Sequence, residues 1–240
     1  MFGFGLDPIY LIFMVPALLL GLFAQWRVSS AYQKYSQVAN ARGLTGADTA
    51  RVLMQSEGLG YLNVEGIAGN LTDHYDPRAK TVRLSEGSSA APSIAAMAVV
   101  AHELGHALQD KQGYFWLNVR GGIVGLANIG SQLGTMLFFG GLLLASFVGS
   151  NFGFSIAWIG VLFMSAGVVF ALVTLPVEFD ASRRAREMLA RNGLISPQEA
   201  DGVKAVLDAA ALTYVASAAQ AVMQLIYWVS LLNRSRDNYR

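Results

Sequence analysis

The sequence predicts a mainly α-helical membrane protein, in which three or four transmembrane helices are joined to an α+β domain with a small sheet. Two observations lead to this fold class. First, 54% of the 240 residues are hydrophobic, 14% are charged and the mean hydropathy is +0.42, which is too apolar for an ordinary soluble domain. Second, residues 121–177 contain no Lys, Arg, Asp or Glu, whereas residues 28–120 are mixed in polarity and include β-like segments.

The composition also limits the partners and the chemistry. The net charge is +1, and no dense basic stripe with interleaved aromatic residues occurs, which argues against a nucleic-acid partner. The chain has no cysteine, so disulfides and thiolate metal ligands are excluded. Its three histidines are His74, His102 and His106. His74 lies in a turn-rich run with acidic neighbours, and we interpret it as a solvated loop histidine and not as a metal ligand.

The first three apolar segments have the length of membrane spans. Residues 8–26 carry no charge and can cross about 30 Å of hydrocarbon. No basic start or cleavage site is evident, so we expect residues 1–27 to form a retained N-terminal anchor. Residues 121–176 predict a helical hairpin, with spans near residues 127–148 and 154–175.

The fourth apolar segment, residues 212–232, has two interpretations. Gln220 and Gln224 lie one turn apart within it. Either they face the interior of a helix bundle, or the segment lies in the membrane interface and does not cross. With its tail, the segment makes up the region of residues 212–240.

Residues 28–120 form the first part of the α+β domain. Two segments, residues 61–67 and 80–84, are β-like, and the turn-rich run of residues 73–77 divides them. The second segment forms either an edge strand that pairs with an extended substrate backbone, or part of a structural hairpin. Residues 87–92 are expected to be a flexible connection.

The next helix, with Ser93 as its cap, carries the motif His-Glu-Leu-Gly-His at residues 102–106. On an α-helix, His102 and His106 are offset by only about 40° around the axis, so both imidazoles can bind one zinc ion. Glu103 lies about 100° away, where its carboxylate can act on a water beside the metal. Gly105 has no side chain and would let another element approach closely.

A third ligand is expected in the second part of the domain, residues 177–211. Glu178 is followed three, four and seven positions later by small residues, which would let its helix face press against the zinc helix. Glu178 is therefore our candidate ligand. Asp180 is the competitor, although it lies about 200° away from that face. A purely structural role for Glu178 at a helix N-terminus also stays open.

The topology permits these residues to meet. Two spans separate the two parts of the domain, so both parts lie on the same side of the membrane. Most Lys and Arg residues belong to these parts, and the positive-inside rule therefore predicts that this side is cytoplasmic. A fourth span would export Arg234, Arg236 and Arg240, against the same rule.

The chain resembles the YugP-type membrane zinc metallopeptidases over nearly its whole length. The motifs that carry the resemblance are DHYDPR at residues 73–78, KTVRLS at 80–85, HELGHALQ at 102–109 and EFDASRRA at 178–185. The resemblance implies a zinc-dependent peptidase of the bacterial inner membrane, and the α+β domain is accordingly expected to be zincin-like.

The chain is also distantly similar to the membrane gluzincins that include the CAAX prenyl proteases. In those proteins an aspartate four residues after the ligand glutamate supports a zinc histidine; here that position is Ser182. Asp180 or another carboxylate is the alternative support. Arg183 and Arg186, on the same helix, are candidates for stabilising the oxyanion of the transition state.

The leading hypothesis is a membrane-anchored zinc endopeptidase. His102, His106 and Glu178 would bind Zn²⁺, and Glu103 would serve as the general base and then the general acid. Because Glu178 comes just after a span, we expect the site to lie close to the bilayer surface and the substrates to be membrane-associated peptides or proteins. The alternatives are an intramembrane metalloprotease and a non-catalytic, zinc-bound membrane scaffold or chaperone-like protein.

Overall fold

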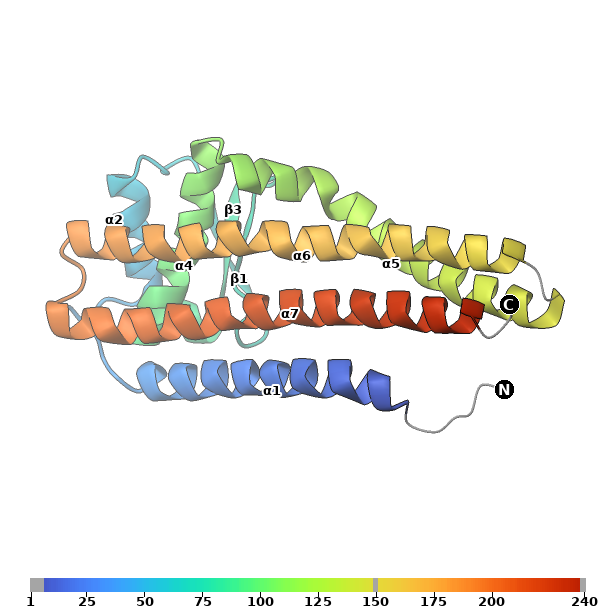
Figure 1. Ribbon diagram of the computed structural model, residues 1–240. Coiled ribbons are helices and arrows are strands. Elements are labelled where there is room, and N and C mark those ends of the chain that lie inside the picture. Colours follow the sequence, from blue (N-terminus) through green and yellow to red (C-terminus); the bar gives the residue numbers. More distant parts are fainter. Residues whose placement is uncertain (1–6, 149–150, 238–240) are drawn as a thin grey trace. The chain divides into compact units, whose positions relative to one another are not determined.

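The computed structural model describes residues 7–148 and 151–237 (Figure 1). It confirms a mainly α-helical protein with a small sheet. The helices are α1 (Pro8–Ser36), α2 (Gly46–Ser56), α3 (Glu86–Ala90), α4 (Ile94–Lys111), α5 (Phe115–Val148), α6 (Asn151–Arg191) and α7 (Pro197–Asp237), and the strands are β1 (Asn63–Ile67), β2 (His74–Asp76) and β3 (Thr81–Ser85).

The chain divides into two compact units. The membrane unit comprises Met1–Phe23, Val119–Thr174 and Tyr214–Arg240, and the sheet unit comprises Ala24–Asn118 and Leu175–Thr213. Within the described residues, α1, α5, α6 and α7 are long and apolar enough to cross a membrane. The fourth apolar segment therefore has the length and composition of a span.

Helices α5 and α6 of the membrane unit pack closely through glycines. A Cβ atom on Gly134 would lie 2.8 Å from the carbonyl oxygen of Gly160, and one on Gly141 would lie 2.6 Å from that of Gly153. Real Cβ atoms do not approach so closely, so both positions require glycine. Such small residues are a common means of helix association in membranes, where backbones must come close together.

Helices α1 and α7 run antiparallel in the membrane unit. Asp7 forms an ion pair with Arg234 at 2.8 Å, and the Gln220 side chain donates a hydrogen bond to the Ala17 carbonyl oxygen at 3.2 Å. Gln220 therefore faces a neighbouring helix, as expected for the bundle interior. The Asp7 carboxylate neutralises Arg234, which weakens the charge objection to a fourth span.

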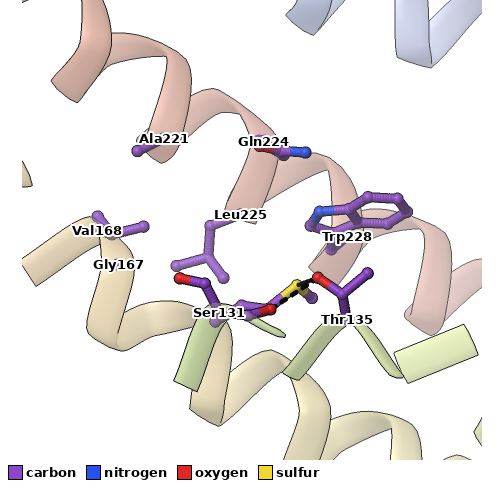
Figure 2. Close-up of a pocket in the computed structure, with 9 residues that line it drawn as sticks. Ser131, Thr135, Gly167, Val168, Ala221, Gln224, Leu225 and Trp228 are labelled. Carbon is purple, nitrogen blue, oxygen red and sulfur yellow. Dashed lines mark hydrogen bonds between the residues drawn. The ribbon is translucent and has the colours of Figure 1, made fainter. Parts of the chain in front are cut away.

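The membrane unit also contains a cavity of about 270 Å³ between α5, α6 and α7 (Figure 2). Its lining residues are Ser131, Thr135, Met164, Gly167, Val168, Ala221, Gln224, Leu225 and Trp228. Thr135 donates a hydrogen bond to the Met164 sulfur at 3.8 Å. The lining contains neither acid nor histidine, so this cavity offers no group for acid–base catalysis or zinc binding.

In the sheet unit, the strand order is β1-β3-β2, with β1 parallel and β2 antiparallel to β3. Of the two interpretations of residues 80–84, the edge strand is therefore wrong, because β3 is the central strand, and the structural hairpin is correct, because β2 and β3 are antiparallel neighbours. Its backbone groups are paired on both sides, and the free edges belong to β1 and β2. The prediction of a turn at residues 73–77 is also wrong in part, since β2 lies within that run.

The expected flexible connection at residues 87–92 is largely helical, and this prediction is wrong as well. Helix α3 covers Glu86–Ala90. Asp73 holds this region, because its carboxylate accepts hydrogen bonds from the Ser85 backbone amide at 2.8 Å and from the Ser88 hydroxyl at 3.0 Å. A buried hydroxyl paired in this way is fixed in place, so the segment is anchored to the sheet.

Helix α4 lies at the centre of the core of the sheet unit. It lies against β3, as can be followed in Figure 1. Val82 and Leu84 of β3 are 0% and 1% exposed and belong to the same hydrophobic cluster as nine of the 18 residues of α4. Each Å² of buried apolar surface contributes roughly 25 cal/mol, so this cluster stabilises the packing of the helix on the sheet.

Candidate metal centre

Helix α4 presents its two histidines on one face. The helix begins with the predicted cap, because the Ser93 hydroxyl accepts a hydrogen bond from the Ala96 backbone amide at 3.2 Å. Apolar residues then continue the helix through a buried core. The imidazole rings of His102 and His106 consequently lie one turn apart on the same face and meet edge to face, with centroids 4.7 Å apart.

Gly105 brings α6 against this face. A Cβ atom at this position would lie 2.6 Å from the carbonyl oxygen of Ala181. Ala181 and Ala185 are themselves 0% exposed, so the small-residue face of α6 packs on α4 as predicted. Glu178 lies one turn before Ala181 on the same face, and this contact brings its carboxylate to the histidines.

The three predicted ligands form a group of the size that one zinc ion requires. The Glu178 Oε2 atom lies 3.3 Å from His102 Nε2 and 3.5 Å from His106 Nε2, and all three ligand atoms lie within 4.8 Å of one another. Ligand atoms about 2.0–2.1 Å from a tetrahedral zinc ion are about 3.3–3.4 Å apart. The donor set therefore fits Zn²⁺ in its chemistry, and both distances to Glu178 match this spacing.

The electrostatics also suit a cation. Glu178 is 1% exposed and lies beyond Thr174, where the membrane unit ends within α6. Burial alone would raise the pKa of its carboxyl, but hydrogen bonds from His102 and His106 outweigh burial and hold the pKa well below its usual range. Burial acts to lower the pKa of His106, but the Glu178 carboxylate outweighs it and raises the pKa. The Glu178 carboxylate thus places a negative charge between two imidazoles. A divalent cation would bind there by displacing protons from the histidines.

Asp180, the competing ligand candidate, is engaged elsewhere. Its Oδ2 atom accepts a hydrogen bond from Gln109 at 2.9 Å, and its carboxylate also pairs with Arg183 and Arg184. Burial would raise its pKa, but these hydrogen bonds outweigh burial and lower it. Asp180 is therefore an ionised acceptor beside the ligand group and not a member of it.

Each histidine has a second partner at its Nδ1 atom. The Ser182 hydroxyl lies 3.3 Å from His102 Nδ1, and Gln109 Oε1 lies 3.0 Å from His106 Nδ1. Hydrogen bonds at the second ring nitrogen commonly orient zinc histidines. Sequence reasoning named Ser182 but missed Gln109. The available signal was its position three residues after His106, which places both on one helix face.

Glu103 is 8% exposed and lies between the two histidines on α4. Among the residues that the structure describes, its carboxylate has no hydrogen-bonding partner. A buried carboxylate without a protein partner is available to bind a water molecule. This is what the predicted general base requires.

The remaining sequence candidates do not join the group. Arg183 pairs with Asp180 and Glu187 on its own helix and not with the ligands. Within the described part of the chain, no contact links Arg186 to the ligands. His74 lies in β2, where its Nδ1 atom is 2.9 Å from the Thr72 carbonyl oxygen. It lies outside the metal-binding group of the described residues, and it lies in a strand and not in the expected loop.

Comparison with known proteins supports this interpretation of the site. The family model described as "Putative neutral zinc metallopeptidase" matches residues 10–233. The chain is 42% identical over 229 residues to the "Putative membrane protease YugP" of Bacillus subtilis (strain 168), covering 95% of this chain and 99% of that protein. No solved structure matches. The family and the His-His-Glu group together identify Zn²⁺ as the metal.

Proposed function

The chain belongs to the neutral zinc metallopeptidase family, and from this premise we propose that it is an endopeptidase with His102, His106 and Glu178 as zinc ligands. The observation that carries the proposal is the spacing of the three ligand atoms, with Glu178 Oε2 at 3.3 Å and 3.5 Å from the two imidazole nitrogens. Three protein ligands leave a fourth tetrahedral position open, which is the arrangement of catalytic zinc sites.

Glu103 carries out the proton transfers in this proposal. When bound, zinc acts as a Lewis acid that polarises the substrate carbonyl and lowers the pKa of water to about 7. Glu103 takes a proton from the attacking water, whose oxygen forms a bond to the carbonyl carbon. Glu103 then delivers this proton to the amide nitrogen as the C–N bond breaks. The low exposure of Glu103 limits exchange of its proton with bulk water.

We further propose that the site lies close to the cytoplasmic surface of the membrane. Glu178 follows Thr174, the last α6 residue of the membrane unit, by four positions, or about 6 Å of helix. The relative from Bacillus subtilis carries the name of a membrane protease. Substrates are accordingly membrane proteins or segments that emerge from a bacterial inner membrane, and the basic residues of the sheet unit favour the cytoplasmic side.

The other two interpretations have less support. An intramembrane site would require α4 to cross the bilayer, yet α4 has 18 residues, is buried in the core of the sheet unit and is not among the four helices with the features of a span. A purely structural zinc site would have four protein ligands. Among the described residues, the metal-binding group contains three.

Replacing Glu103 with glutamine tests the mechanism. The side chain keeps its size, but it can no longer accept a proton. We expect Glu103→Gln to retain about one zinc per chain, as measured by atomic emission, and to lose at least about 10²-fold in the cleavage rate of a reporter protein. Retained proteolysis with normal zinc content would refute the assigned role of Glu103.

A further inference from the structure

Gln109 is a buried polar residue that the proposed mechanism does not use. It is 0% exposed, and it lies on α4 one turn after His106. We infer that Gln109 is a positioning residue, which fixes the proton of His106 on Nδ1 and thereby presents Nε2 to the metal. The inference rests on the proposed function, since it takes His106 as a zinc ligand.

The hydrogen bonds of Gln109 determine which way its amide points. Its Nε2 atom donates to the Val177 carbonyl oxygen at 2.8 Å and to Asp180 Oδ2 at 2.9 Å. Both partners can only accept hydrogen bonds. If the amide were flipped, its oxygen would face two other oxygens in a buried site, at the cost of two hydrogen bonds and a close contact with a carboxylate. The NH₂ end must therefore face α6.

This orientation has a consequence for His106. Gln109 Oε1 is left to face His106 Nδ1 at 3.0 Å, and an amide oxygen can only accept. Nδ1 must then carry a hydrogen. The hydrogen that gives way to a metal ion is then the one on Nε2, which faces Glu178 Oε2 at 3.5 Å, and the neutral imidazole keeps its single N–H group at Nδ1. Gln109 thus holds the Nδ1 hydrogen in place, so that Nε2 is the atom left to bind zinc.

Asp180 explains why this arrangement is rigid. Its carboxylate pairs with Arg183 and Arg184, and Arg184 also donates to Gln112 Oε1 at 2.5 Å. The acceptor that holds the Gln109 amide is therefore itself fixed by two guanidinium groups. The resulting chain runs from Arg184 through Asp180 and Gln109 to His106.

His102 lacks an equivalent constraint. Its Nδ1 atom lies 3.3 Å from the Ser182 hydroxyl. A hydroxyl rotates and can either donate or accept a hydrogen bond, so Ser182 orients the ring without selecting its tautomer. Of the two histidines, His106 is the one whose protonation pattern is set by the protein.

The test compares Gln109→Met with Gln55→Met in the full chain, purified in detergent. Methionine has nearly the size of glutamine but makes neither hydrogen bond. We expect the zinc dissociation constant of Gln109→Met, measured by competition with a chelator, to rise about 10- to 100-fold. Gln55, an exposed residue of α2, should give a change of less than about twofold, since substitutions of surface residues away from the site contribute little. Unchanged affinity in Gln109→Met, or an equal loss in both variants, would overturn the inference.

A second measurement does not depend on whether the variant folds. The chain has only three histidines, so ¹⁵N-histidine spectra of the zinc-loaded wild type are simple to assign. We expect His106 to be protonated on Nδ1 and metal-bound through Nε2; binding through Nδ1 would overturn the inference. Wild-type protein that binds zinc through Nε2 but cleaves no substrate would refute the proposed function and leave the role of Gln109 intact. Wild-type protein that binds no zinc would overturn both.

Discussion

Replacing Gly105 with alanine should damage the metal centre without touching any of its ligands. The added Cβ would lie 2.6 Å from the Ala181 carbonyl oxygen and 3.2 Å from the Ala181 Cα atom. Contacts below 3.0 Å are essentially never seen, and ordinary contact begins at 3.4 Å. Both neighbours are helix backbone, which cannot rotate away. The two helices must therefore separate by about 0.4–0.8 Å.

This separation is large on the scale of zinc coordination. Zinc–ligand distances tolerate about 0.2 Å, and Glu178 moves with Ala181 because both belong to α6. We expect the zinc dissociation constant to rise at least about tenfold, because the shift exceeds this tolerance. Overpacking costs about 1–3 kcal/mol, whereas the gain in helix propensity from Gly to Ala is only about 1 kcal/mol. The fold should thus lose at most about 2 kcal/mol of stability while the site loses zinc.

Gly121→Ala is the matched control. Gly121 lies in α5, and a Cβ atom there would meet no heavy atom within 4 Å. We expect normal zinc affinity and equal or slightly higher thermal stability, from the propensity gain alone. Zinc affinity is measured by chelator competition, and stability by the loss of helical circular dichroism on heating. Wild-type zinc affinity in Gly105→Ala would refute the conclusion that close contact of α4 and α6 builds the site.

Two further predictions concern protons and topology. Burial acts to lower the pKa of His106, but Glu178 outweighs burial and raises this pKa above its usual value. Protons should therefore begin to displace zinc above pH 6.5 as the pH falls, and zinc affinity should drop by up to about tenfold per pH unit below the raised pKa. Affinity independent of pH from 8 to 6 would contradict this. If α7 crosses the membrane, cysteines introduced at Gln37 and Asn233, both exposed in a chain without cysteine, should react with an impermeant maleimide from opposite sides of the membrane. Labelling from one side would place residues 212–232 in the interface.

Much of the site could be predicted because its determinants are local in sequence. The spacing of His102 and His106 puts both rings on one face of any α-helix, and the Ser93 cap is a local hydrogen bond. Glu178 meets the histidines through a non-local contact, but the small residues on its helix face indicated that contact in the sequence. Gly105 and Ala181 are the two sides of that contact.

The errors arose where long-range pairing decides the structure. Strand order depends on which strands pair, and the residue pattern of the β3 segment is compatible with either a central or an edge strand. Asp73 orders the segment of α3 through side-chain hydrogen bonds that composition does not reveal. Gln109 was missed because a glutamine after a zinc motif looks like an ordinary surface residue until its partners on α6 are known.

The most direct test of the proposed centre is the zinc content of Glu178→Gln beside that of Asp180→Asn, with proteolysis assayed on the same samples. Both changes remove one negative charge at nearly constant volume. We expect Glu178→Gln to lose zinc and activity together after dialysis against a weak chelator. Asp180→Asn should keep about one zinc per chain, with weaker affinity, because Asp180 acts only through Gln109. Full zinc occupancy and cleavage in Glu178→Gln, with loss of both in Asp180→Asn, would show that Asp180 is the third ligand.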